Sequence, residues 1–236
     1  MLEGREILLV GGSGGLGSAS ARILAKDGAR LVVTYHRNSS RAEALRSIAS
    51  VVPCDVTQAA DRRRVLDEAP GLYGLVVFTG DPSRVKSPEE FEAAARHAQE
   101  VNYLGPIALA REAAARMQAA KQEGAIVLFS TMQAVSLFGG STAYAAAKAS
   151  LQYAGRVLAK EVRATNIRVN CVAPGVPAAG MAEASIASGK YDHFLKDGIV
   201  PRFGRAEDVA RVVRFLLTPD CYVTGQVISV DGGATL

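Results

Sequence analysis

The chain has 236 residues, of which 49% are hydrophobic, and a formal net charge of +4. This length and composition suffice for one α/β domain with a large buried core. Basic residues are scattered among acidic ones, which argues against nucleic acid as a partner. Cys54, Cys171 and Cys221 match no metal-ligand spacing, and no apolar run is long enough for a signal peptide or a membrane span. These features predict a soluble, cytoplasmic protein without a metal site or a membrane partner.

Short apolar runs alternate with helical patterns along the chain. Most runs are apolar throughout, which is typical of parallel strands covered by helices on both faces. The alternation predicts right-handed crossovers and a doubly wound α/β sheet, in a single domain over residues 1–236. The predicted strands are Ile7–Val10, Leu31–Tyr35, Val51–Val56, Leu75–Phe78, Ala125–Ser130, Ile167–Ala173 and Val227–Val230. The predicted helices are Leu16–Lys26, Arg41–Ile48, Gln58–Glu68, Pro88–Gln122 (expected to be two helices), Ala143–Val162 and Glu207–Leu217.

The sequence GGSGGLG, residues 11–17, lies between the first predicted strand and the first predicted helix. A turn with so few side chains lets a pyrophosphate approach the backbone at the helix N-terminus. Gly12, Gly14 and Gly17 match the spacing G-x-G-x-x-G, whereas Gly11, Gly15 and Gly17 match G-x-x-x-G-x-G. A plain tight turn is the alternative, but the place of the motif favours dinucleotide binding. The candidate contacts are Gly11, Ser13, Gly14, Gly15, Leu16 and Gly17.

The end of the second predicted strand bears on which dinucleotide binds. A carboxylate about 20 residues after the glycine turn would bind the adenosine ribose and repel a 2′-phosphate. The segment LVVTYHRNSSR, residues 31–41, contains no acid and offers His36 and Arg37, together with Ser39 and Arg41. Positive charge and hydroxyl donors suit a phosphate, although a solvated loop would also account for them. We therefore expect NADP(H) in preference to NAD(H).

A second group of candidate residues lies on the helix predicted over residues 143–162. Tyr144 and Lys148 are four residues apart, on one helix face. A phenol has a pKa of about 10, and lowering it by three units takes about 4 kcal/mol. One ammonium about 5 Å away supplies roughly 3 kcal/mol at an effective dielectric constant of 20. An exposed helix pair is the alternative, but the glycine turn in the same domain favours an acid–base role.

With these motifs, the chain resembles the short-chain dehydrogenase/reductase family over nearly its whole length. The resemblance implies a single Rossmann-type domain with a seven-stranded parallel sheet. It is carried by GGSGGLG (11–17), CDVT (54–57), VNYLGP (101–106), YAAAK (144–148), IRVNCVAPG (167–175) and TGQVISVDGG (224–233).

The resemblance implies roles for individual residues. Tyr144 becomes the general acid in reduction, or the base in oxidation, and Lys148 lowers its pKa and holds the nicotinamide ribose. Asn102 matches the asparagine that supports a water-mediated proton relay to that lysine. Two further sets match cofactor contacts: Asp55 and Val56 at the adenine, and the turn Pro174, Gly175 and Val176 beside the nicotinamide.

The chain departs from the family pattern at several positions. Thr131 stands where a serine usually donates a hydrogen bond to the substrate carbonyl, and Ser130 and Ser141 are alternatives that we consider less suitable. After the fourth strand, the usual NNAG is VFTG, residues 77–80. Thr79 and Gly80 keep a small residue and the glycine near the cofactor. Val10 and Ala179 replace two threonines, so weaker cofactor binding is expected.

Residues 176–201 interrupt the strand–helix alternation and, by resemblance, form a lid over the substrate. Met181, Tyr191, Phe194 and Leu195 would either line an apolar pocket or pack the lid onto the body. The sequence looks most similar to 3-oxoacyl-carrier-protein reductases, which implies a small carbonyl substrate and a homotetramer or homodimer. We therefore expect an NADPH-dependent carbonyl reductase. The alternatives are an NAD-linked alcohol dehydrogenase and a cofactor-binding protein with little catalysis.

Overall fold

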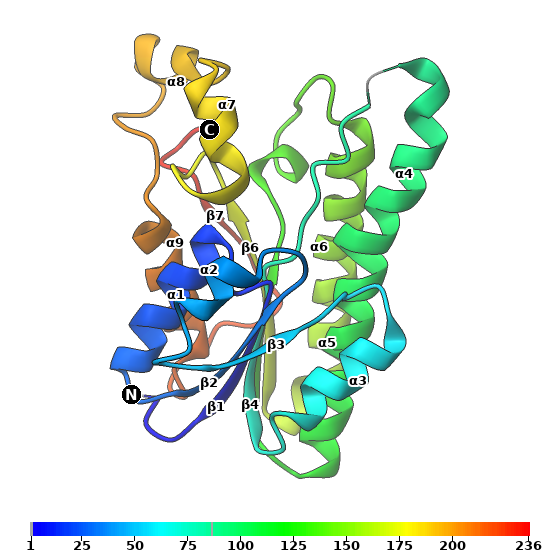
Figure 1. Ribbon diagram of the computed structural model, residues 1–236, viewed down its shortest axis with the longest axis vertical. Helices are drawn as coiled ribbons and strands as arrows, with labels where there is room; N and C mark the ends of the chain where they lie inside the picture. Colours follow the sequence, from blue (N-terminus) through cyan, green and yellow to red (C-terminus); the bar gives the residue numbers. More distant parts are fainter. Residues whose placement is uncertain (1, 86) are drawn as a thin grey trace.

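The computed structural model describes residues 2–85 and 87–236 of the chain. Within these residues, seven strands form one parallel sheet in the order β3-β2-β1-β4-β5-β6-β7. The parallel sheet with helices on both faces confirms the predicted fold class (Figure 1). The strands are β1 (Glu6–Val10), β2 (Arg30–Tyr35), β3 (Ser50–Pro53), β4 (Leu72–Val77), β5 (Gly124–Phe129), β6 (Ile167–Pro174) and β7 (Val227–Val230).

Two layers of helices cover the sheet. In Figure 1, helices α1, α2 and α9 lie on one face, and α3, α4, α5 and α6 lie on the other. The segment from 88 to 122 forms two α-helices, as predicted, and they are joined by a π-helical turn, Glu100–Leu104. The helices are α1 (Gly15–Lys26), α2 (Ser39–Glu43), α3 (Ala59–Asp67), α4 (Phe91–Gln99), α5 (Gly105–Ala119), α6 (Thr142–Val162), α7 (Glu183–Ala187), α8 (Asp192–Lys196) and α9 (Ala206–Leu217).

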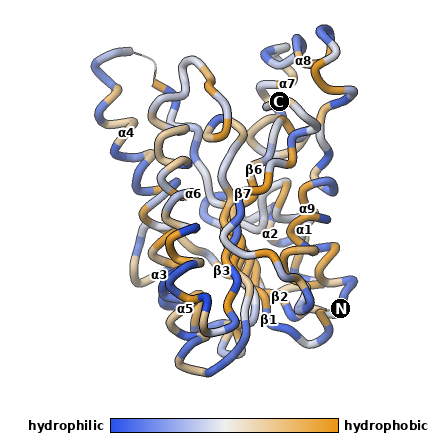
Figure 2. Tube along the Cα trace, turned by 180° about the vertical axis from the view of Figure 1, so that it is seen from behind, coloured by the Kyte–Doolittle hydropathy of each residue, from blue (hydrophilic) through white to orange (hydrophobic). Residues whose placement is uncertain are grey.

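The central strands β1, β4 and β5 are mostly apolar because both of their faces are buried. Successive side chains of a strand point to opposite faces, so Leu8 and Val10 pack toward α5 and α6, whereas Ile7 and Leu9 pack toward α1 and α9. Figure 2 shows this apolar core as orange strands between helices that are bluer on the outside. The helical layers therefore leave only the edges of the sheet open.

The first strand–helix unit ends as its sequence predicts. Helix α1 ends at Lys26, and Gly28 adopts a φ of 83°, a left-handed conformation that glycine takes without strain. Several other boundaries differ from prediction, and β4 begins at Leu72, three residues before the predicted start. The helix expected over residues 41–48 is the short α2, residues 39–43, followed by turns, and the strand expected over residues 51–56 ends at Pro53.

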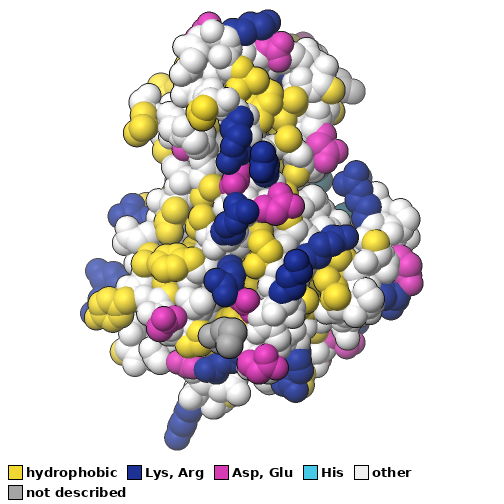
Figure 3. Space-filling model, turned by 90° about the vertical axis from the view of Figure 1, so that its left-hand side faces the viewer, with side chains coloured by type: hydrophobic (Ala, Val, Ile, Leu, Met, Phe, Trp, Pro, Cys, Tyr) yellow, Lys and Arg dark blue, Asp and Glu magenta, His cyan; other side chains and the backbone are white. Residues whose placement is uncertain are grey.

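The strand order reverses between β1 and β4. At such a point the crossovers leave on opposite sides, and a crevice opens at the carboxyl ends of the strands. The segments after β1, β4, β5 and β6 all begin at this edge, which places the glycine turn beside the segment after β4. The face seen in Figure 3 shows Lys and Arg interspersed with Asp, Glu and hydrophobic side chains. Among residues 2–85 and 87–236, no helix combines the length and the apolar character needed to cross a membrane.

Candidate active site

A cleft of about 950 Å³ lies along the carboxyl edge of the sheet. It runs from the glycine turn and the ends of β2 and β3, across the segments after β4, β5 and β6, to the start of α6 and residues 177–191. Apart from Asn102, Val176, Ser39 and Arg41, the candidate catalytic and cofactor-binding residues all line this one cleft. The sequence motifs are therefore brought together although up to about 160 residues separate them.

The glycine turn is built from close backbone contacts. Gly11 has a φ of 72°, and its N–H donates to the Thr34 hydroxyl at 3.0 Å. A Cβ on Gly17 would lie 2.5 Å from the Gly12 Cα, so α1 can approach the turn this closely only without side chains. A Cβ on Gly15 would lie 2.8 Å from the Gly180 nitrogen, so residues 179–180 rest directly on the turn. The first turn of α1 carries no acid.

These features fit the diphosphate of a dinucleotide. Backbone N–H groups at the start of α1 point out of the helix, and the helix dipole favours an anion there. Gly14, which lies before α1 and lines the cleft, leaves its Cβ position in contact only with the Gly11 oxygen at 3.4 Å. The Thr79 hydroxyl oxygen at the middle of the cleft is buried without a hydrogen-bond partner among the described residues. The cleft thus offers backbone N–H groups that no side chain covers, together with the Thr79 hydroxyl.

One end of the cleft is lined by residues that follow β2 and β3. The Asp55 carboxylate accepts hydrogen bonds from the Thr57 N–H and hydroxyl at 3.0 and 2.7 Å. Its other oxygen lies 3.7 Å from His36 Nε2. Arg37 is exposed and, across residues 2–85 and 87–236, forms no ion pair. Ser39 and Arg41 lie in or beside α2 and do not line the cleft.

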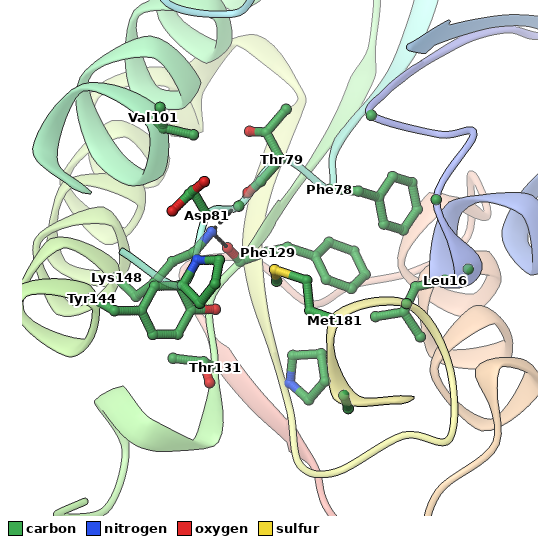
Figure 4. Close-up of a pocket in the computed structure, with 18 of the residues that line it drawn as sticks. Leu16, Phe78, Thr79, Asp81, Val101, Phe129, Thr131, Tyr144, Lys148 and Met181 are labelled. Atoms are coloured by element: carbon green, nitrogen blue, oxygen red, sulfur yellow. Dashed lines mark hydrogen bonds between the residues drawn. The ribbon is translucent and has the colours of Figure 1, made fainter. Parts of the chain in front are cut away.

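Tyr144, Lys148 and Thr131 gather on one side of the cleft, opposite Leu16 and Met181 (Figure 4). Tyr144 and Lys148 come from successive turns of α6, and Thr131 from the segment after β5. Burial raises the pKa of Tyr144 to about 12, and a hydrogen bond with the Thr131 side chain opposes this rise. The phenol is therefore protonated near neutral pH and touches the hydroxyl that replaces the usual serine.

Lys148 is buried, and its exposed fraction is only 2%. Its Nζ donates to the carbonyl oxygens of Thr79 at 2.9 Å and Phe129 at 2.7 Å (Figure 4). Burial lowers the pKa of Lys148 to about 7. The expectation that Lys148 lowers the pKa of Tyr144 differs from the arrangement found, because burial dominates the pKa of the phenol and the amine is directed to the two carbonyls.

Asn102 lies next to the cleft but does not line it. It is fully buried in the π-helical turn between α4 and α5. Its Nδ2 donates to the Asp81 carbonyl oxygen at 2.9 Å, and its Oδ1 accepts from the Asp81 N–H at 2.9 Å. A Cβ on Gly80 would lie 3.5 Å from Asn102 Oδ1 and 3.6 Å from Lys148 Nζ. Asn102 therefore holds the segment after β4 beside the lysine.

Aromatic packing replaces the usual amides at the end of β4. The Phe78 ring lies 4.4 Å from the Phe129 ring, centroid to centroid, at the ends of neighbouring strands (Figure 4). Edge-to-face and tilted ring pairs of this kind stabilise a core by about 0.5–1.5 kcal/mol beyond their buried area. The carbonyl oxygens of Thr79 and Phe129 accept hydrogen bonds from the Lys148 amine, so the altered segment still has a polar contact within the site.

The lid predicted over residues 176–201 contains α7 and α8, and its side chains divide between two roles. Met181 lines the cleft, and Tyr191 both lines it and packs in an apolar cluster with Phe194. Leu195 does neither and is 40% exposed. Val176, expected beside the nicotinamide, does not line the cleft, because it packs in that cluster with Met132 and Val200. The apolar side chains of the lid thus both wall the cleft and attach the lid to the body.

Gln133 and Arg84 are polar residues of the cleft wall that were not among the site residues predicted from the sequence. Gln133 follows Thr131 by two residues, and Arg84 lies after β4. The Gln133 side chain is hydrogen-bonded to Ser141, and Arg84 Nη2 lies 3.3 Å from the Ser185 hydroxyl of the lid. The sequence did contain a signal for Gln133, because it is a polar residue two positions after Thr131, the expected carbonyl-binding residue. Arg84 had no comparable signal.

Comparisons with known proteins agree with this geometry. The family model described as "Enoyl-(Acyl carrier protein) reductase" matches residues 11–235. The chain is 34% identical to a human 3-oxoacyl-[acyl-carrier-protein] reductase, over 96% of each chain. It is 29% identical to NADPH-dependent aldehyde reductase 2, chloroplastic, of Arabidopsis thaliana, over 100% of this chain and 95% of the relative.

A solved structure gives the same result for the fold. A short-chain type dehydrogenase/reductase from Mycobacterium ulcerans superimposes with a TM-score of 0.91 at 25% sequence identity, covering 99% of this chain and 90% of that one. The chain is an oxidoreductase that belongs to the short-chain dehydrogenase/reductase family.

Proposed function

We propose that the protein uses NADPH to reduce a ketone or 3-oxoacyl carbonyl to an alcohol, with Tyr144 as the general acid. The observation that supports this most strongly is the convergence of Tyr144, Thr131 and Lys148 on the cleft that begins at the glycine turn. A relative that is named as a 3-oxoacyl-[acyl-carrier-protein] reductase supports the reaction class.

The chain's own groups act on the carbonyl oxygen. NADPH, when bound, would supply the hydride that the carbonyl carbon takes up. Thr131 and Tyr144 hold the carbonyl oxygen through their hydroxyls, and Tyr144 gives its proton to that oxygen as negative charge develops there. The high pKa of Tyr144 keeps the phenol protonated before reaction, as a general acid requires. Lys148, whose Nζ donates to two carbonyl oxygens at the cleft, would hold the nicotinamide ribose.

The two ends of the cleft divide the binding of the dinucleotide between them. Asp55 and Val56 hold the adenine, the glycine turn holds the diphosphate, and Pro174 with Gly175 lies beside the nicotinamide. Arg37, which forms no ion pair within the described part of the chain, and His36 bind the 2′-phosphate. The preference for NADPH is also supported by the Arabidopsis relative, whose name states NADPH dependence.

We also infer that the chain acts as a homotetramer or homodimer in the cytoplasm. Helix α6 leaves apolar side chains on its outer face, where Tyr153 is 70% exposed and Val157 is 41% exposed. Exposed apolar side chains gathered on one face are typical of a protein–protein contact. A second copy of α6 is the proposed partner of this face.

The test is NADPH oxidation with hexan-2-one and with methyl 3-oxobutanoate, followed at 340 nm. Tyr144→Phe is expected to lower kcat by about 100-fold or more, because general acid catalysis contributes about that much, while the Kd for NADPH stays within a few-fold. Tyr222→Phe, at a fully exposed position outside the cleft, is the matched control and keeps full activity. Tight NADPH binding without turnover on either ketone would contradict the proposal and support the cofactor-binding alternative.

A further inference from the structure

Gln133 lies beside the two hydroxyls that are assigned to the substrate carbonyl. It belongs to the short helical turn Met132–Ala134, which directly follows Thr131. Its backbone N–H donates to the Thr131 hydroxyl oxygen at 3.3 Å. Gln133, Thr131 and Tyr144 all line the same cleft. Gln133 therefore lines the cleft directly after the hydroxyl assigned to the reacting oxygen, and it is not needed to protonate that oxygen.

The orientation of the Gln133 side chain is fixed by Ser141. The Ser141 hydroxyl donates to Gln133 Oε1, and Ser141 lies immediately before α6, three residues before Tyr144. This hydrogen bond leaves the amide nitrogen, with its two N–H donors, as the free polar end of the side chain. Among the described residues no acceptor is seen for that nitrogen. The cleft wall thus presents a held hydrogen-bond donor.

We propose that Gln133 is a specificity-determining residue that donates to a second oxygen of the substrate. The inference rests on the proposed carbonyl reduction and deepens it. Substrates of this site then carry an acceptor oxygen, such as an ester or ketone oxygen, one or two carbons away from the reacting carbonyl. A site built around a hydrogen-bond donor discriminates against an analogue without the acceptor, because the donor loses its water and gains no partner.

The experiment compares two ketones of equal chain length. Methyl 3-oxobutanoate carries the second oxygen function, and hexan-2-one lacks it. The two variants are Gln133→Leu, which removes the donor, and Gln133→Glu, which keeps an oxygen for Ser141 but presents an acceptor to the substrate. The readout is the ratio of kcat/KM for the oxoester to kcat/KM for the ketone, so the intrinsic reactivity of each compound cancels between wild type and variant.

In both variants this ratio is expected to fall by about tenfold, the size of one lost hydrogen bond. The Kd for NADPH is measured in parallel and is expected to stay within a few-fold of wild type. A ratio that does not change, or equal losses on both compounds, would overturn the assignment of Gln133 and leave the reductase proposal standing. Failure of the wild-type protein to reduce either compound with NADPH would overturn the reductase proposal and this inference with it.

Discussion

Lys148 places an amine where a charge is costly. Its side chain is almost fully buried between α6 and the ends of β4 and β5, and burial lowers its pKa to about 7 from the ordinary 10.5. Two carbonyl oxygens accept from Nζ, which partly compensates the loss of water. A residue kept under these conditions is destabilising for the fold, and such a cost is typical of a residue that serves function.

The buried amine makes stability depend on pH in a predictable direction. Between pH 7 and 10.5 the unfolded chain holds the Lys148 proton and the folded chain has released it, so the unfolding free energy rises with pH. From pH 6 to pH 9 this residue is expected to add about 2–3 kcal/mol to the unfolding free energy, and Lys148→Met removes that increase. Urea unfolding followed by circular dichroism at both pH values measures this increase.

Lys160→Met, on an exposed turn of α6, is the control and keeps the wild-type increase. An unchanged increase in Lys148→Met would contradict the assigned pKa.

The turn between β1 and α1 shows how backbone contact overrides helix propensity. Alanine is better than glycine inside a helix by about 1 kcal/mol, so propensity alone predicts that Gly17→Ala stabilises α1. The new Cβ, however, would lie 2.5 Å from the Gly12 Cα and 2.6 Å from its oxygen, and both are backbone atoms that cannot rotate away. Overpacking of this kind costs more than the propensity gain.

Gly17→Ala is therefore expected to lower the unfolding free energy by about 1–3 kcal/mol, measured by chemical denaturation. Gly14→Ala is the matched change in the same turn. Its Cβ would meet only the Gly11 oxygen at 3.4 Å, an ordinary contact, so the loss of stability should stay below about 1 kcal/mol. Equal losses of unfolding free energy in the two variants would contradict this explanation, because they would show that the contact with Gly12 makes no difference.

The elements show which features could be predicted from sequence. Buried parallel strands leave continuous apolar runs, so the sheet and its helices were predictable, and so were the motifs at its carboxyl edge. The boundaries depended on local detail. The third strand ends at Pro53, with a last hydrogen bond from the Cys54 N–H to the Tyr35 oxygen, and the predicted helix over residues 41–48 gives way to turns after Glu43. Tertiary packing decided the rest: Val176 joined the lid cluster, and Gln133 depends on a hydrogen bond to a residue eight positions away.

The whole molecule combines a rigid sheet with a cleft at the point where the strand order reverses. The glycine turn, the adenine-binding residues and the pair on α6 come from separate strands, so a dinucleotide bound along the cleft would contact most of the sheet's carboxyl edge. Any ligand that binds only the folded chain raises its stability in proportion to the logarithm of its concentration over Kd. Thermal unfolding therefore reports cofactor preference without requiring a known substrate.

At a concentration of 100 times its Kd, NADPH is expected to add about 2.7 kcal/mol to the unfolding free energy. For a chain of this length that corresponds to a rise in Tm of about 5–10 °C. NADH at the same concentration should give a smaller rise, because Arg37 and His36 have no 2′-phosphate to bind. Arg37→Ala is expected to reduce the NADPH shift toward that of NADH and to leave the NADH shift unchanged. Arg41→Ala, on an exposed residue of α2 outside the cleft, is the control and keeps both shifts. A larger shift with NADH in the wild-type protein would contradict the 2′-phosphate site. Equal loss of both shifts in Arg37→Ala would also contradict it, because a side chain that binds the 2′-phosphate has no such contact with NADH.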